Sequence, residues 1–320
     1  MDTLSRLIDL ARPQASLDLR CLLSGAFDID HGQLEAGIAP FHLVLDGACI
    51  VETADGVQYA LHAGDFMLLP RGAAHRVRDV RRSAAAAPLT LAHDGMLPLR
   101  RSGGGDGSDG SGDAQASADL DLLCGRFLYA PGSSALLLNA LPDPLHVSLG
   151  GVQSLGSLQT VIAVMRSEAE RRQPGALAIV TALSHALFAM ALRVHGEQHA
   201  STSGMLAVLA DARLGASVQA MLNAPEHAWT IAELGELAAM SRATYARHFN
   251  ERAGITVMDF LTQIRMAIAC DLLRRTKRSA AEIGEAVGYQ SEAAFGKAFQ
   301  QSVGVTPGRY RRSTPANDAE

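Results

Sequence analysis

The stretch TIAELGELAAMSRATYARHFNERAGIT, residues 230–256, recurs later in the chain as SAAEIGEAVGYQSEAAFGKAFQQSVGVT, residues 279–306. The offset between matching residues is 49 in the first part of the repeat and 50 in the second, so the later copy has one extra residue in its middle. Each copy opens with a capping box, which satisfies the free N–H groups at a helix start, at Thr230-x-x-Glu233 and Ser279-x-x-Glu282. An insertion confined to the turn between two helices predicts a pair of helix-turn-helix units.

The second helix of each unit is predicted to start after a serine that can cap it, Ser241 or Ser291. Aromatic residues four positions apart then face the core, Tyr245 with Phe249 and Phe295 with Phe299. The remaining face is small or charged, as a helix needs to enter the major groove and reach base edges or phosphates. Its residues are Arg242, Ala243, Ala246, Arg247, Glu292, Ala293, Gly296 and Lys297. The alternative is that these are solvated faces of ordinary helices.

A connecting helix of about 20 residues is predicted between the two units, from about Thr256 to Arg275. At about 1.5 Å per residue it spans about 30 Å, close to the ~34 Å of one turn of B-DNA. A stiff connector of this length places two recognition helices in successive major grooves. Residues 205–312 carry 13 Lys and Arg against 10 Asp and Glu, whereas residues 1–204 carry 15 against 21, so only the C-terminal part favours phosphate.

Residues 211–312 resemble the DNA-binding domain of the AraC/XylS family of bacterial transcription regulators. The resemblance rests on MSRATYARHF, GYQSEAAFGKAF and the closing GVTPGRYRR. It implies double-stranded operator DNA and RNA polymerase as partners, and base contacts from Arg242, Ala243, Ala246, Arg247, Glu292, Ala293 and Lys297. One departure is GITVMDF in the first unit, where the family usually has a proline after the threonine.

The N-terminal part is predicted to be antiparallel β-structure, because residues 17–80 alternate short apolar runs with Gly, Asp and Pro. Strands are expected to resume at DLLCGRFLYA and ALLLNALPDPLHVSL, after residues 101–119, which lack large apolar side chains and predict a disordered loop. The expected fold is therefore α+β and multidomain. We expect a sensor domain at 1–155, a helical element at 156–194, a linker at 195–210, the DNA-binding domain at 211–312 and a tail at 313–320.

GDFMLLPRGAAH, residues 64–75, matches the second cupin motif, G-x5-P-x-G-x2-H, so the β-domain resembles a cupin barrel with His75 pointing inward. A catalytic cupin also needs HxH and a glutamate, which complete three imidazoles and a carboxylate around a metal. In FHLVLDGACIVE, His42 has no histidine two residues further on. Two histidines make a poor site, so we expect no cofactor, no bound metal at His42 and His75, and no enzymatic activity. The other histidines are expected at the surface.

Helical spacing begins after Gly156, and its apolar stripe is Leu158, Ile162, Met165 and Ala169. We expect this stripe to form the seam of a homodimer, the alternative being that it packs on the chain's own β-domain. A second helix contains the longest apolar window, residues 176–192, but Thr181, Ser184 and His185 in its middle make a bilayer span costly. We therefore expect a buried or dimer-forming helix and no membrane partner.

A cytoplasmic location is predicted from the cysteines and the chain start. Four cysteines without a CxxC pair do not describe a secreted protein held by disulfides. The start, MDTLSRLIDLARP, predicts a short amphipathic helix ended by Pro13 and lacks the continuous apolar region of a signal peptide. Both features favour a reducing compartment.

A degenerate cupin ahead of an AraC-type domain is the arrangement of one subgroup of that family. MDTLSRLIDL, CLLSG, LLPRGAAHR and LLCGRF most resemble its oxidant-responsive, reactive-chlorine-sensing regulators. In that subgroup two cysteines matter, and the resemblance carries them over to Cys21 and Cys124. A thiolate can be oxidised to a sulfenic acid that a second thiol resolves to a disulfide. The competing interpretation is a small organic ligand in the barrel, with Cys124 a buried strand residue. Cys49 and Cys270 are expected to be structural.

Overall fold

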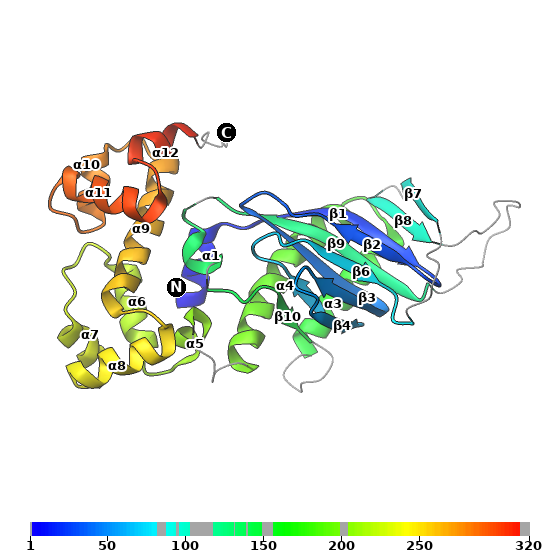
Figure 1. Cartoon of the computed structure of the whole chain (residues 1–320), viewed down its shortest axis with the longest axis horizontal. Coiled ribbons are helices and arrows are strands. Elements are labelled where there is room, and N and C mark those ends of the chain that lie inside the picture. Colours follow the sequence, from blue (N-terminus) through cyan, green and yellow to red (C-terminus); the bar gives the residue numbers. More distant parts are fainter. Residues whose placement is uncertain are drawn as a thin grey trace, which may run out of the picture. The chain divides into compact units, whose positions relative to one another are not determined.

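The computed structural model describes residues 2–81, 88–93, 96–102, 118–130, 132–138, 140–148, 156–198 and 204–313. The chain folds into two compact units (Figure 1). Residues 14–129 and 142–191 form one, which we call the β-unit, and residues 1–13, 130–141 and 192–320 form the other, the helical unit. Most of the loop predicted at residues 101–119 lies outside the described residues.

A curled sheet forms the β-unit, and its described strands run in the order β10-β5-β3-β9-β1-β8-β7 (Figure 1). The first part of β3 pairs with β5 and β9 and its last part with β4 and β6, while β2 pairs with β6. All these pairs are antiparallel, but β1 and β8 run parallel. The strands are β1 (Gln14–Leu23), β2 (Asp28–His31), β3 (Ile38–Thr53), β4 (Gln58–His62), β5 (Phe66–Leu68), β6 (His75–Arg78), β7 (Leu89–His93), β8 (Pro98–Ser102), β9 (Leu120–Leu128) and β10 (Leu145–Val147).

The inner face of this sheet is a core to which most strands contribute. Its buried members are Cys21, Leu23, Phe27, Ile29, Val44, Cys49, Val51, Leu61, Met67, Leu69, Val77, Leu120, Leu122 and Cys124. On β9, Gly125 allows close packing of the strand between its neighbours. A Cβ there would lie 2.6 Å from Cζ of Phe41 and 2.6 Å from the carbonyl oxygen of Ser16. The glycine of the LLCGRF string is thus required by β3 and β1 on either side.

Helix α3 (Gly156–Arg171) packs on β3 of the same unit. Ile162, Met165 and Ala169, which were expected to form a dimer seam, are at most 8% exposed within the single chain. The structure therefore contradicts the seam prediction for these three residues, while the side chain of Leu158 lies outside the described part. An amphipathic stripe needs an apolar surface to cover it, and the chain's own sheet provides one.

A buried ion pair joins the sheet to α3. Arg20 on β1 donates from Nε and Nη2 to the two carboxylate oxygens of Asp121 on β9, at 2.8 and 2.6 Å. Its Nη1 donates to the carbonyl oxygen of Ala169 in the last turn of α3, at 2.7 Å. Both side chains are less than 10% exposed, so the pair is sheltered from water.

Helix α4 (Ala176–Gln198) is the one described helix that is long and apolar enough to cross a membrane. One of its faces, however, is buried within the protein, with Val180, Ser184 and Phe188 on it. Phe188 packs on Phe127 of β9, with ring centroids 4.9 Å apart. The hydroxyl of Ser184 donates to the carbonyl oxygen of Val180. The chain's own core therefore covers one face of α4.

The helical unit is built around its longest helix, α9 (Val257–Arg275), as Figure 1 shows. The others are α1 (Thr3–Ala11), α2 (Ala135–Leu138), α5 (Met205–Ala210), α6 (Gly215–Asn223), α7 (Ile231–Leu237), α8 (Arg242–Ala253), α10 (Ala280–Ala286), α11 (Glu292–Val303) and α12 (Pro307–Ser313). The predicted connecting helix and both predicted helix pairs are therefore present.

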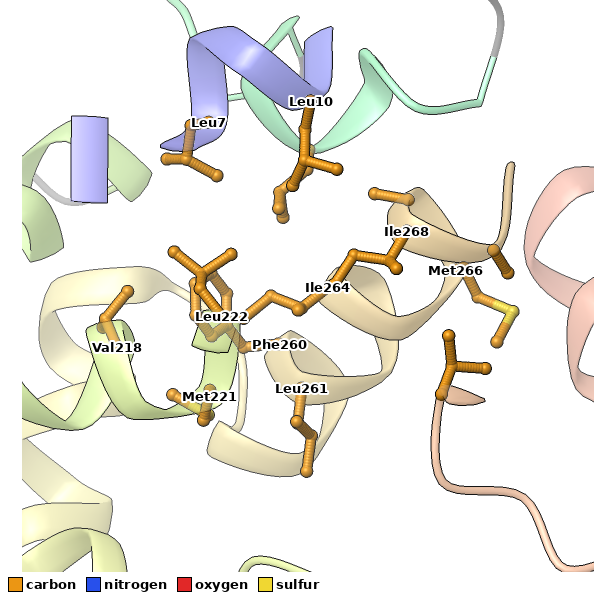
Figure 2. Packing of buried hydrophobic residues seen from close by; sticks show 14 of the residues in the cluster. Leu7, Leu10, Val218, Met221, Leu222, Phe260, Leu261, Ile264, Met266 and Ile268 are labelled. Atoms are coloured by element: carbon orange, nitrogen blue, oxygen red, sulfur yellow. The ribbon is translucent and has the colours of Figure 1, made fainter. Parts of the chain in front are cut away.

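The N-terminal helix α1 packs in the helical unit, although it was assigned by sequence to the sensor domain. Leu7 and Leu10 lie at most 4% exposed in one core with Val218, Ile264 and Ile268 (Figure 2). Arg12, which follows the helix, forms an ion pair with Asp271 of α9 at 3.5 Å. The amphipathic spacing predicted the helix but did not specify the surface that covers it.

The segment 135–138 was expected to be a strand and instead forms helix α2. Leu136 and Leu137 are buried, and Leu136 joins the core around α9. A short apolar run has the same appearance in a buried strand and in a buried helix turn, so periodicity could not decide between them. Leu145–Val147, later in the same run, does form a strand, β10.

Candidate nucleic-acid interface and thiol site

Both helix-turn-helix units have the local structure that their sequences predict. Thr230 with Glu233 and Ser279 with Glu282 form complete capping boxes at the starts of α7 and α10. The hydroxyls of Ser241 and Ser291 cap α8 and α11. Each second helix ends at a glycine in the left-handed region, Gly254 with φ 73° and Gly304 with φ 82°.

The exposed face of each second helix carries the residues that sequence reasoning assigned to DNA. Tyr245, Phe249, Phe295 and Phe299 are fully buried and fix which face of each helix looks outward. Six of the seven predicted contact residues are exposed, and Ala246 is half-buried; the six are Arg242, Ala243, Arg247, Glu292, Ala293 and Lys297. Arg247 lies 3.9 Å from Glu251 one turn further on, and both side chains are more than 60% exposed. The exposed side chains of Arg242, Arg247 and Lys297 are thus available to a polyanion such as DNA.

Two side chains that sequence reasoning missed hold the units in place. Arg265 of α9 donates to the carbonyl oxygens of Pro225 and His227, before the first unit, and lies over the ring of Tyr289 in the second, 5.9 Å from its centroid. Asp211, before α6, lies 2.7 Å from Nε2 of His248 and accepts from Arg252 at 3.2 Å, both on α8. No local motif marks these residues, because each bridges segments far apart in sequence.

The two cysteines implicated by the family resemblance lie side by side in the β-unit. On the antiparallel strands β1 and β9, Cys21 is opposite Leu122 and Cys124 is opposite Leu19, so the cysteines are diagonal neighbours facing the same core. The neighbouring Cys124 thiol lowers the pKa of Cys21, whereas the Cys21 thiol and burial raise the pKa of Cys124 well above its usual value.

A cluster of three histidines adjoins this thiol pair. Nδ1 of His42 lies 3.3 Å from Sγ of Cys124, and its Nε2 lies 2.7 Å from Nε2 of His75. The ring of His31 stacks on that of His75, with centroids 4.6 Å apart and planes inclined by 3°. Burial lowers the pKa of all three histidines, that of His31 to about 4.

His31 corrects the expectation that the remaining histidines lie at the surface, since it packs against the two interior ones. His62 does conform, because its side chain is 70% exposed. His31 lies eleven residues before His42 and belongs to no recognisable motif, so the sequence gives no sign of its position. Only the pairing of β2 with β6, which sets His31 opposite His75, brings it into the cluster.

The other two cysteines lie in apolar surroundings. Burial raises the pKa of Cys49, on β3, to about 12 and that of Cys270, on α9, to about 12. A separate pocket of about 520 Å³ lies in the helical unit and is lined by residues of α2, α9 and α12, among them Leu136, Met266 and Tyr310.

Comparison with known proteins agrees with these features along nearly the whole chain. Residues 2–197 match a cupin domain family and residues 234–313 a helix-turn-helix domain family. The chain is 33% identical to an uncharacterized HTH-type transcriptional regulator of Haemophilus influenzae, over 98% of this chain and 99% of that one. It is 30% identical to the RCS-specific HTH-type transcriptional activator RclR of Escherichia coli K12, over 97% of each. It is 31% identical to the HTH-type transcriptional regulator MtrA of Neisseria gonorrhoeae, over 98% of each.

A cupin unit joined to paired helix-turn-helix units defines a DNA-binding transcription regulator with a cupin domain. The chain belongs to the AraC family of these regulators. It is a regulator and not an enzyme.

Proposed function

We propose that this regulator senses oxidants, reactive chlorine species in particular, by forming a disulfide between Cys21 and Cys124. The observation that carries the proposal is the position of the two cysteines as diagonal neighbours on β1 and β9, both facing the same core. A disulfide needs Cα atoms within about 4–7 Å, a separation that diagonal neighbours in a sheet approach. The name of the Escherichia coli relative, which specifies reactive chlorine species, supports the choice of oxidant.

The proposed chemistry consumes one oxidant molecule for two thiols. Hypochlorous acid transfers its chlorine to Cys21, giving a sulfenyl chloride and releasing water with the thiol proton. Cys124 then attacks the sulfur of Cys21, and the S–S bond replaces the S–Cl bond while a proton and chloride leave. The two thiols together lose two electrons, which reduce the chlorine to chloride.

A change in the conformation of the β-unit would transmit the signal to the DNA-binding helices. Cys21 directly follows Arg20, which joins β1 to β9 and to α3. Drawing Cys21 toward Cys124 changes the local pairing of β1 with β9. It thereby also changes the contact that Arg20 makes with α3. We propose that this two-state change alters operator binding in a stress response in the reducing cytoplasm, where RNA polymerase is the further partner.

The DNA contacts proposed for this response come from both units. Arg242, Ala243, Ala246 and Arg247 would read one half-site, and Glu292, Ala293 and Lys297 the next. The support is the equivalent outward face of α8 and α11, joined by the 19 residues of α9. That helix spans about 28 Å, slightly less than one turn of B-DNA.

We propose a homodimer that uses an apolar surface other than the buried α3 stripe. Val164 on α3 and Leu177 and Ile179 on α4 are each at least 40% exposed. A dimer formed through these residues should dissociate in the variant Leu177→Asp/Ile179→Asp, measured by sedimentation. An unchanged dimer in that variant would exclude this surface.

The decisive experiment is oxidation of the purified full-length protein with stoichiometric hypochlorite. We expect the loss of two thiols, a Cys21–Cys124 peptide in non-reducing mass spectrometry, and a change in operator binding that dithiothreitol reverses. Cys21→Ser should abolish the response and keep basal DNA binding, whereas Cys49→Ser should leave the response intact. A normal response of Cys21→Ser would exclude the mechanism and favour a small organic ligand as the signal.

A further inference from the structure

The pocket of about 520 Å³ in the helical unit is formed by four stretches of the chain that are distant in sequence. They are Gly132 with α2, the middle of α9, the end of α11 with the turn that follows it, and α12. Small-molecule sites in proteins are clefts of about 300–1,000 Å³ that are largely formed before the ligand binds. The pocket therefore has the size of a site for a small organic molecule.

The deep part of this pocket is apolar. Leu136 of α2 and Met266 and Ala267 of α9 line it, and each is at most 5% exposed. Tyr310 of α12 lines it as well and is 3% exposed. An apolar body that enters the pocket leaves water and packs against these side chains, which favours binding.

The rim of the pocket is polar but uncharged. Gln263, Ser302 and Ser313 line it and are exposed to solvent. Amide and hydroxyl groups can both donate and accept hydrogen bonds. None of the described residues that line the pocket carries a charge. A carboxylate, phosphate or ammonium group bound there would therefore lose water without gaining an opposite charge, which is costly.

The wall that α2 contributes is held in place by the protein itself. Gly132, just before α2, has φ 88°, in the left-handed region that favours glycine. A Cβ at this position would lie 2.5 Å from Sγ of Cys270 and 2.9 Å from the hydroxyl oxygen of Tyr310. The backbone of Gly132 thus packs directly against side chains of α9 and α12. The pocket wall is therefore formed without a ligand.

We propose that this pocket binds a neutral, amphipathic organic molecule. Its ring system or chain lies against Leu136 and Met266, and a hydrogen-bonding group at one end meets Gln263 or Ser302 at the rim. The site is separate from the cysteine pair, which lies in the β-unit. The inference therefore does not depend on the proposed thiol chemistry.

A ligand in this pocket contacts the DNA-binding machinery directly. Ser302 and Val303, which line the pocket, are the last two residues of α11, the second helix of the second helix-turn-helix unit. On the opposite wall, α2 belongs to the segment 130–141 that follows β9 of the β-unit in the chain. The bound molecule is thus a second signal that reaches α11 without any change at the cysteines.

The test uses reduced full-length protein without oxidant, so that its result is independent of thiol oxidation. The probe is N-phenylnaphthylamine, a neutral molecule whose fluorescence rises in apolar surroundings, and we expect saturable binding of one probe per chain. Ala135→Phe places a ring in the pocket from α2 and should weaken binding at least about tenfold. Ala281→Phe, at an exposed position of α10, is the matched control and should leave affinity unchanged. No saturable binding, or wild-type affinity in Ala135→Phe, would overturn the site.

A charged analogue tests the class of ligand. Anilinonaphthalenesulfonate has the same ring systems with an added sulfonate, and it should bind the pocket at least about tenfold more weakly than the neutral probe. Equal affinities that are lost together in Ala135→Phe would overturn the neutral class. Circular dichroism checks that Ala135→Phe folds. If it does not, Ser302→Trp at the exposed rim decides the question, and wild-type probe affinity in that folded variant would overturn the site.

Discussion

Sγ of Cys124 lies 3.3 Å from Nδ1 of His42, its direct partner across the β3–β9 pair. Cys21 on β1 is the diagonal neighbour of Cys124 in the same core, and Nε2 of His42 lies 2.7 Å from Nε2 of His75. Cys124 therefore links the proposed thiol switch to the buried histidines beside it.

DNA binding should depend on one exposed cation in each recognition helix. Arg247→Ala and Lys297→Ala should each cost about 1–3 kcal/mol of specific binding, through loss of base or phosphate contacts. Fluorescence anisotropy on a footprinted operator, repeated over a salt series, measures the loss. Arg81→Ala, an exposed cation of the β-unit, should bind like the wild type. Undiminished affinity in both helix variants would refute this placement of the DNA contacts.

Cys49 and Cys270 should be nearly inert in the native protein. The thiolate is the reactive form, and a pKa raised to about 12 leaves a thiolate fraction of ~10⁻⁴ at pH 8. Iodoacetamide should therefore label them much more slowly in the native protein than in urea, with a native rate that rises as pH increases. Peptide mass spectrometry over time measures both rates. Equal rates in the two states would contradict the burial argument.

The ion pair of Arg20 with Asp121 should be costly to break from one side. Arg20→Met leaves a buried carboxylate without its partner and should destabilise the β-unit by about 3–5 kcal/mol in urea unfolding. The double variant Arg20→Met/Asp121→Leu should recover much of that loss, since no uncompensated charge remains. If both variants unfold at the same urea concentration, unpaired charge is not the cause.

Helix α1 should stabilise the helical unit. Leu7→Ala removes a side chain that is 1% exposed in the core of Figure 2 and should cost about 2–5 kcal/mol of unfolding free energy. Met258→Ala, at a position 42% exposed on α9, is the control and should change stability little. Equal effects of the two substitutions would show that α1 does not contribute to this core.

Close packing of β9 should make Gly125 intolerant of a side chain. Gly125→Ala places a Cβ 2.6 Å from the ring of Phe41 and the carbonyl oxygen of Ser16, so the strands must separate. We expect a clear loss of thermal stability. Gly296→Ala, where no atom lies within 4 Å of the new Cβ, should raise stability by up to about 1 kcal/mol of helix propensity. A fully stable Gly125→Ala protein would argue against the observed pairing.

The sequence by itself determined the features that depend on near neighbours. The capping boxes at Thr230 and Ser279, the caps at Ser241 and Ser291 and the outward face of each recognition helix follow from spacings of three or four residues. Repetition of the whole pattern then identified the paired units. The strands around His42 and the helix at residues 3–11 were likewise predicted, because amphipathic periodicity is a local property.

Tertiary structure alone decided what each of those elements packs against. The stripe with Ile162 and Met165 covers the chain's own sheet, and α1 packs on α9, because an apolar face specifies burial but not its partner. His31 joins His75 only through the pairing of β2 with β6, and Cys21 meets Cys124 only through the register of β1 on β9. Such pairings depend on the register of strands distant in sequence, and that register is set by the packing of the whole sheet.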